Sequence, residues 1–163
     1  MKILKRMLIV MVILLVIIQF FRPTRNISEI IPTNEITAAV AVPDDVFGIL
    51  KNSCFDCHSN NTRYPWYANI QPAAWFMNGH IKDGKRGLNF SEFATYSLRR
   101  QYRRLNDIIE NVNDGEMPLP SYLLIHSDAK LTAGQKERIV SWANAAIDSM
   151  KAKYPADSLL SKR

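Results

Sequence analysis

The sequence predicts an all-α protein that begins with a separate apolar helix. Apolar side chains recur at steps of three and four residues through most of the chain, which is the spacing of one face of an α-helix. Convincing runs of alternating apolar and polar residues, which would predict strands, are missing from the sequence. The third observation is the start of the chain, where an apolar run follows a short basic segment.

Residues 7–21 form this apolar run, with Gln19 as its one polar member. A basic segment followed by an apolar one is an export signal, and Phe20-Phe21-Arg22-Pro23 is a poor cleavage sequence. A helix over the run spans about 22 Å, which is short of the roughly 30 Å hydrocarbon core, but flanking Lys and Arg side chains can reach the membrane surface. We expect residues 1–22 to be a single-pass anchor in the cytoplasmic membrane, with a cleaved signal peptide as the alternative. The rest of the chain then faces the periplasm or exterior.

The net charge of +6 is concentrated at the N-terminus. Five of the 21 basic residues and no acidic residue lie in the first 25 positions, which leaves 16 bases and 15 acids in the other 138. A nearly neutral body does not favour nucleic-acid binding. The local basic cluster Arg99-Arg100 and Arg103-Arg104 is followed by Asp107, and we interpret it as a solvated helix face.

Four segments are expected along the chain. After the anchor, residues 23–42 are predicted to be a linker, because they contain prolines and polar residues without helical periodicity. Residues 43–154 are predicted to be the folded domain, and residues 155–163 a flexible tail. Such a domain is near the size at which a bound cofactor helps stability. The helices expected within it span about 44–52, 73–82, 91–113, 122–126 and 132–151. Gly84 and Gly87 are expected to break the second of these helices, Ser91 to cap the third, and a capping box of Thr132 and Gln135 to open the last.

The motif Cys54-Phe55-Asp56-Cys57-His58 is a C-x-x-C-H sequence, which is typical of covalent attachment of one haem c. Two thiols at this spacing can each add to one vinyl group of the porphyrin, and His58 is then held as the proximal ligand of the iron. A zinc module and a structural disulfide are the alternatives, but zinc usually needs a second pair of ligands. A thiol–disulfide oxidoreductase would need strands around the cysteines.

Met117 is the first candidate for the distal ligand of the haem iron. It stands directly after a predicted helix end, and Pro118 restrains the backbone there, so the thioether can be aimed across a haem face. His80 and His126 are the alternatives, and the fourth possibility is an open position. An open position would suit a haem-based sensor or a peroxidase-like module.

The sequence around these residues resembles the c-type cytochromes and, more narrowly, the small haem-binding domain family of exported bacterial proteins. The resemblance covers about residues 43–152 and implies a cytochrome-c-like helical fold with one haem and His58/Met117 ligation. It rests on the C-x-x-C-H motif and on Tyr64-Pro-Trp66-Tyr, Ile70-Gln-Pro72, His80-Ile-Lys-Asp-Gly84-Lys, Leu88-Asn-Phe-Ser91, Met117-Pro-Leu-Pro-Ser-Tyr122 and Leu131-Thr-x-x-Gln135…Trp142.

Several other residues are candidates for supporting the haem. A carbonyl between Tyr64 and Pro72 is expected to accept the Nδ1 proton of His58. Trp66, Tyr67 and Trp75 are expected to pack either on the porphyrin or in the ordinary core. Lys82, Lys85 and Arg86 are expected either to pair with haem propionates or to be solvated.

The sequence as a whole predicts a membrane-tethered monohaem cytochrome that transfers electrons to a redox partner protein. No acid–base pair, nucleophile triad or phosphate loop is present, so an electron-transfer protein is favoured over an enzyme.

Overall fold

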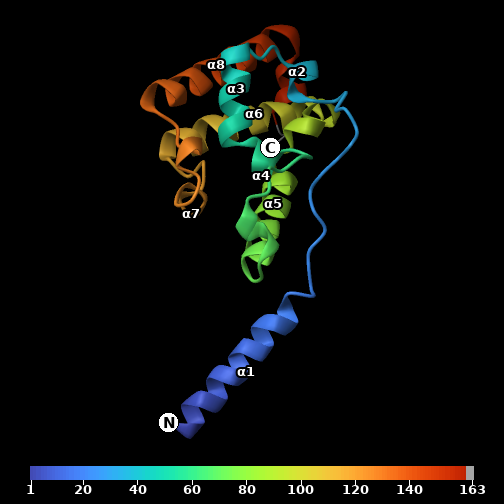
Figure 1. Ribbon diagram of the computed structural model, residues 1–163. Helices are drawn as coiled ribbons and strands as arrows, with labels where there is room; N and C mark the ends of the chain where they lie inside the picture. The colour runs from blue at the N-terminus through green and yellow to red at the C-terminus, as the bar shows by residue number, and fades with distance from the viewer. Residues whose placement is uncertain (161–163) are drawn as a thin grey trace.

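The structure is a computed structural model that describes residues 1–160, and every regular element in that range is helical. The predicted all-α class is therefore confirmed. Helix α1 (Lys2–Ile18) stands apart, and the remaining elements gather into one domain (Figure 1). These are α2 (Ile36–Ala39), α3 (Asp44–Ser53), α4 (Phe55–His58), α5 (Ala73–Gly87), α6 (Leu98–Asp114), α7 (Pro120–Leu123), α8 (Ala133–Lys153) and α9 (Ala156–Leu159), with short 3-10 turns η1 (Trp66–Asn69), η2 (Phe90–Thr95) and η3 (Ser127–Ala129).

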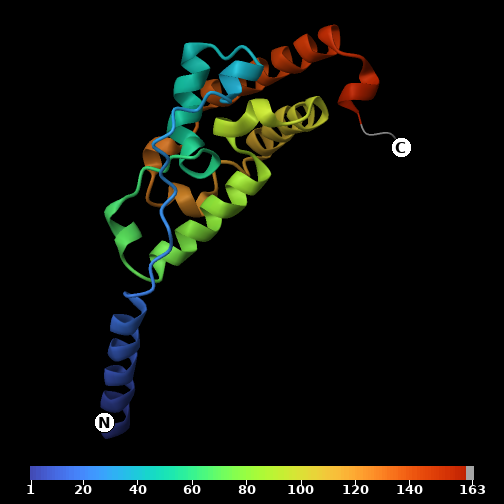
Figure 2. The same cartoon turned by 90° about the vertical axis from the view of Figure 1, so that its right-hand side faces the viewer.

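The core of the domain lies where α6 packs against α8, with α3 on α8 and α9 on α6 (Figure 2). The apolar stripe of α6 is buried there, and Leu105 is fully excluded from solvent. Ile139 of α8 and Val46 of α3 are also fully buried. Helix α8 begins where the capping box was predicted, since Thr132 accepts a hydrogen bond from the Gln135 amide and Gln135 accepts one from the Thr132 amide.

Two helix boundaries differ from the prediction. Helix α5 does not break at Gly84 but continues to Gly87. The long helix predicted to start at Ser91 begins instead at Leu98, where the Ser97 hydroxyl accepts a hydrogen bond from the Arg100 amide. Residues 90–95 form the separate turn η2, which is capped by the Asn89 side chain. Ser91 is a residue type that caps helices and Gly84 one that breaks them, but the surrounding structure determines whether a helix begins or ends at each position.

The segment predicted to be a linker lies along the domain and is not free of it. The Asn26 amide donates to the Tyr64 hydroxyl at 2.7 Å, and the Ala94 amide donates to the Asn34 carbonyl at 3.0 Å. Ile36 of α2 is fully buried in the core. The tail likewise folds as far as it is described, because α9 buries Leu159 against the core. Residues 161–163 of the predicted tail lie outside the described residues.

Replacing Ile36 by alanine is expected to destabilise the domain by about 2–5 kcal/mol, because it removes a fully buried side chain and leaves a cavity. Ile30→Ala is the matched control, since Ile30 is 78% exposed in the same segment, and its effect should be within about 0.5 kcal/mol. Urea unfolding of both variants measures the difference. Equal stability of the two variants would mean that the segment is not part of the folded unit.

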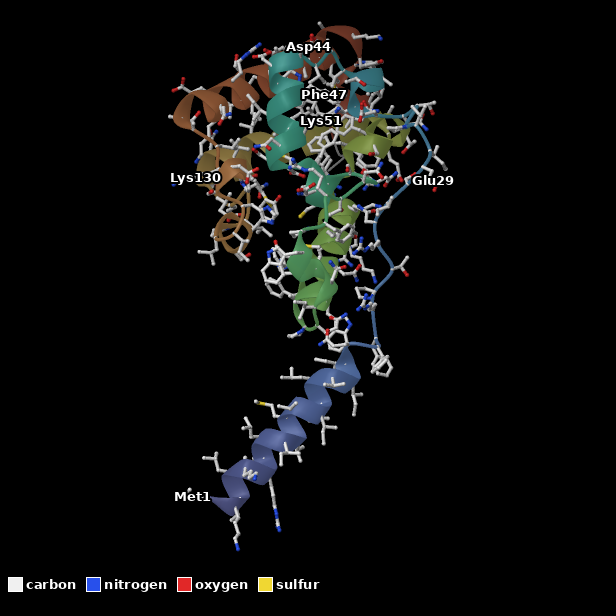
Figure 3. All side chains as sticks on the ribbon, viewed as in Figure 1. Met1, Glu29, Asp44, Phe47, Lys51 and Lys130 are labelled. Carbon is white, nitrogen blue, oxygen red and sulfur yellow. The ribbon has the colours of Figure 1, made fainter. Side chains whose placement is uncertain are left out.

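Helix α1 is apolar and has no buried residue. In Figure 3 its side chains project freely, with no other part of the described chain packed over them. Between residues 1 and 160, no helix combines the length and the apolar character needed to cross a membrane.

Candidate functional site

The C-x-x-C-H motif forms the junction of two helices. Helix α3 ends at Ser53, and Cys54 both follows it and precedes the single turn of α4. The amides of Cys57 and His58 both donate to the Cys54 carbonyl, at 3.2 Å and 3.0 Å. Phe55 fixes this turn to the core, because its ring stacks on Phe90 with centroids 5.1 Å apart. The two thiols and the imidazole are thus placed on one rigid turn of backbone.

His58 is oriented by a backbone carbonyl from outside its own helix. Its Nδ1 lies 2.9 Å from the Leu88 carbonyl oxygen, just after α5. The predicted acceptor between Tyr64 and Pro72 is therefore wrong, although the predicted kind of contact is present. A carbonyl acceptor holds the proton on Nδ1 and leaves the Nε2 lone pair for a metal. Burial lowers the pKa of His58, and the hydrogen bond that its ring donates to the Leu88 carbonyl opposes the shift, so the neutral form is favoured.

A cavity of about 450 Å³ brings the predicted ligands together. Cys54, Cys57 and His58 line it from one side and Met117 lines it as well. Most of the remaining wall is apolar. It comes from helices α3, α6 and α8, from the turn η2 and from connecting segments. Its apolar residues are Leu50, Leu88, Phe90, Ile108, Val112, Leu119, Leu131 and Ile139. A cavity of this size with an apolar wall and a few convergent polar groups suits a cofactor.

Met117 reaches the cavity because α6 ends just before it. Gly115 takes the left-handed conformation, with φ at 73°, and closes the helix. The amides of Glu116 and Met117 then donate to the Asn111 carbonyl at 3.0 Å and 3.1 Å. These bonds fold the chain back on the last turn of α6 and fix the backbone from which the Met117 thioether extends.

Both cysteines are free thiols in the structure. Burial raises the pKa of Cys54 to about 12, and the nearby Cys57 adds to the shift. Burial also raises the pKa of Cys57 to about 11, with the charge of Asp56 adding to it. The thiols therefore stay protonated at neutral pH, and neither has the depressed pKa that marks a reactive redox cysteine.

Asp56, one of the two variable positions of the motif, is buried and fully partnered. Its carboxylate accepts a hydrogen bond from the Tyr122 hydroxyl at 2.8 Å and pairs with Arg63 at 3.3 Å. The contact with Tyr122 ties the turn of α4 to α7, which follows Met117 in the chain. Sequence analysis missed this residue, because the spacing of Asp56, Arg63 and Tyr122 along the chain carries no recognisable pattern.

The two alternative histidines lie differently. His80 lines the main cavity and also a second pocket of about 150 Å³, and Cys57 lines both as well. His126 lines the second pocket and not the main cavity. Its Nε2 lies 2.6 Å from the Tyr67 hydroxyl. His80 therefore shares the main cavity with Met117, while His126 is hydrogen-bonded to Tyr67 in the second pocket.

Several expected supporting residues lie away from the main cavity. Trp66 is 75% exposed, Trp75 donates to the Phe21 carbonyl at 2.8 Å, and Tyr67 lines the second pocket. Lys85 donates to Asn26, and Arg86 pairs with Asp83. The basic residue that does line the main cavity is Arg104, paired there with Asp107 at 2.7 Å. The expectation that the Arg99–Arg104 cluster is only a solvated helix face is therefore wrong for Arg104.

A sequence model of the haem-binding domain family matches residues 13–145 of the chain. The chain belongs to this haem-binding domain family. Neither a curated protein nor a solved structure was found with significant similarity to it. The match extends well before residue 43, where the folded domain was predicted to begin, and it includes the segment that the structure shows packed along the domain.

The residues of this haem-binding domain fit the group that the family implies. Nitrogen and sulfur donors stand on the wall of one largely apolar cavity, and two free thiols stand beside the histidine. Within residues 1–160, no three His, Cys, Asp or Glu side chains gather as a set of metal ligands. Identity as a haem-binding domain thus agrees with the donor set that the cavity presents.

Gly84 lets α5 approach the motif closely, and this contact gives a test of the haem-binding domain. A Cβ atom at Gly84 would lie 2.7 Å from the Cys57 carbonyl oxygen, so Gly84→Ala must push α4 and α5 apart. We expect a loss of about 1–3 kcal/mol in the free energy of unfolding, measured by urea denaturation.

Gly87→Ala on the same helix is the matched control for Gly84→Ala. A Cβ there meets no atom within 4 Å, so the better helix propensity of alanine should stabilise the domain by up to about 1 kcal/mol. The same sign for both variants would contradict the close contact between α4 and α5.

Proposed function

We propose that this haem-binding domain is a monohaem c-type cytochrome that is tethered to the outer side of the cytoplasmic membrane and passes electrons to a partner protein. The observation that carries the proposal is that both thiols of the motif line the same cavity as His58 and Met117. A haem iron supplies a one-electron couple when it is bound. The chain itself supplies attachment, axial ligands and shielding from water.

The cysteines account for attachment. Cys54 and Cys57 would hold the haem, because a thiol S–H at each position could add across one vinyl group, with a carbon–sulfur bond formed and the hydrogen taken up by the neighbouring carbon. This addition needs no oxidant or reductant. The high pKa values of both thiols indicate that the uncharged S–H form is present at neutral pH.

His58 and Met117 would hold the haem iron, because both line the cavity. The Leu88 carbonyl fixes the proton of His58 on Nδ1, which presents Nε2 as the ligand atom. A thioether as the second ligand raises the reduction potential relative to two histidines, which suits an electron carrier. Arg104 lines the cavity from α6 in a pair with Asp107, and its guanidinium would be the basic group that a haem propionate meets there.

Tethering is assigned to α1. The helix is apolar and exposed throughout, with Lys2, Lys5 and Arg6 near its start and Arg22 and Arg25 after its end. Its 17 residues give a length of about 25 Å, and basic side chains at both ends can extend toward lipid headgroups. The excess of positive charge before the helix keeps that end in the cytoplasm and places the domain outside.

Export and haem loading test this proposal directly. The chain is produced in a host with a c-type haem maturation pathway, denatured in SDS and stained in the gel for haem. A haem band at the mass of the chain, in the membrane fraction, is the expected result. A second measurement, reversible one-electron titration of the purified protein, tests electron transfer. Haem that is lost in SDS would overturn covalent attachment, and an irreversible titration would overturn the electron-transfer role.

A further inference from the structure

The end of the domain nearest α1 carries a group of exposed apolar side chains. In Figures 1 and 2, α7 and the start of α5 lie on the side of the domain that faces α1, whereas α8 and α9 lie on the opposite side. We name this group the apolar tip. It consists of Trp66, Ile70, Trp75, Phe76, Leu124 and Ile125, which are 75%, 47%, 41%, 64%, 85% and 66% exposed.

The two segments that form the apolar tip carry no Lys, Arg, Asp or Glu. Residues 64–81 and 117–126 are free of these four residue types, although charged residues make up 22% of the chain. Tyr67 from the first segment and His126 from the second are hydrogen-bonded to each other, and both segments line the second pocket, so the two segments lie next to each other. An uncharged surface with several large exposed apolar side chains marks an interaction site.

The apolar tip is joined directly to the end of α1. The Gln71 amide donates to the Gln19 side chain at 2.9 Å, and the Gln71 side chain donates to the Phe21 carbonyl at 3.0 Å. The same Phe21 carbonyl accepts the indole N–H of Trp75. The chain that follows α1 is therefore hydrogen-bonded to Trp75 of the tip and to Gln71, the neighbour of Ile70.

We propose that the apolar tip docks the haem-binding domain onto the lipid surface that holds α1. The inference rests on the proposed tether, because α1 brings the tip to the membrane. Tryptophan side chains favour the membrane–water boundary, and the tip holds two of the three in the chain. Arg22 and Arg25, directly after α1, supply the positive charge that attracts anionic headgroups. Burial of the tip among headgroups and upper acyl chains is the mode of an interfacial anchor.

Docking fixes the orientation of the domain. A tether alone would leave all faces of the domain in water, but docking on the tip turns α8 and α9 away from the lipid. The bilayer itself then covers the tip, and a partner protein has to bind another face of the domain.

The test is hydroxyl-radical footprinting of the full-length haem-loaded protein in vesicles of phosphatidylcholine and phosphatidylglycerol. Two leucines form a matched pair, because Leu124 in the tip is 85% exposed and Leu160 beyond α9 is 53% exposed. In water Leu124 must be oxidised faster than Leu160. Docking reverses this order, with loss of most of the oxidation at Leu124, Trp66 and Phe76. If Leu124 remains the faster of the two in vesicles, docking is overturned.

A charged variant gives the second measurement. The double variant Leu124→Glu and Ile125→Glu changes two exposed side chains, so the fold is retained. Because the charges oppose docking, oxidation of Trp66 and Phe76 in vesicles should rise to the level expected from their exposure. Leu160→Glu should leave the protection unchanged. Recovery of the chain with the vesicles is recorded in the same samples. An unchanged chain that is recovered with the vesicles but unprotected contradicts docking and keeps the tether, whereas an unchanged chain that is not recovered contradicts both. A charged variant that keeps its protection also contradicts docking on the tip. Haem absorbance reports separately on the cytochrome proposal.

Discussion

Replacing Cys54 and Cys57 together by serine is expected to abolish the haem that the chain retains in SDS. Serine keeps the size of each side chain but has no thiol to add to a vinyl group. Both cysteines line the cavity, and they are the only two in the chain, so no other residue is able to form a thioether. The measurement is in-gel haem staining of the exported protein, normalised to the amount of chain detected by immunoblot.

The two single variants are the controls for the double cysteine variant. Each keeps one thiol at the junction of α3 and α4, so each should retain a covalent haem, with a spectrum shifted by the remaining vinyl group. If the double variant still stains, attachment does not run through these thiols. If both single variants lose all stain while the chain remains abundant, the thiols are needed for a step before attachment.

The helices of this chain were largely predictable, and their boundaries depended on contacts that no local pattern records. The capping box at Thr132 involves residues three positions apart, so the sequence contained the whole interaction. Gly84 shows the opposite case. It appeared as a helix breaker, but the absence of a Cβ serves the approach of Cys57, which is far away in the chain. Local rules predict a helix break at such a glycine, and only the packing partner explains why the helix continues.

The predicted linker shows a similar limit of sequence analysis. Residues 23–42 have no helical periodicity, and that observation is correct for most of the segment. Their backbone groups find partners in the domain instead, as in the bonds of Asn26 and Asn34. Irregular segments satisfy their hydrogen bonds with neighbours that are distant in sequence. Polarity alone therefore does not distinguish a segment that packs along a domain from a free linker.

The candidate site divides in the same way between local and distant contributions. The residues of the C-x-x-C-H motif are consecutive in the chain, so the sequence alone predicted that they lie together at the site. The groups that orient it come from elsewhere: the Leu88 carbonyl on His58, Tyr122 on Asp56, and Arg104 on the cavity wall. A backbone carbonyl has no sequence signature at all, which explains why the kind of partner for His58 was predictable and its identity was not.

Met117→Ala is expected to remove the methionine-linked charge-transfer band of the oxidised protein and to lower its reduction potential. Met117 shares the cavity with His58, and its backbone is fixed by two amides on the Asn111 carbonyl. Thioether ligation raises a haem potential, and axial ligands set potentials over a range of roughly 0.8 V, so loss of the ligand should shift the midpoint by a substantial part of that range. Optical spectroscopy of the oxidised protein and a redox titration measure the two effects.

Three variants separate Met117 from its competitors. Met77→Ala removes a methionine that lines the second pocket and not the main cavity, so its spectrum should match that of the unchanged protein. His126→Ala should also leave the band in place, because His126 lies against Tyr67. His80→Ala is the sharpest comparison, since His80 lines the same cavity as Met117. A band that survives in Met117→Ala would mean that Met117 is not the ligand behind it. The absence of the band from the unchanged protein, with a potential that changes in His80→Ala and not in Met117→Ala, would transfer the distal position to the histidine.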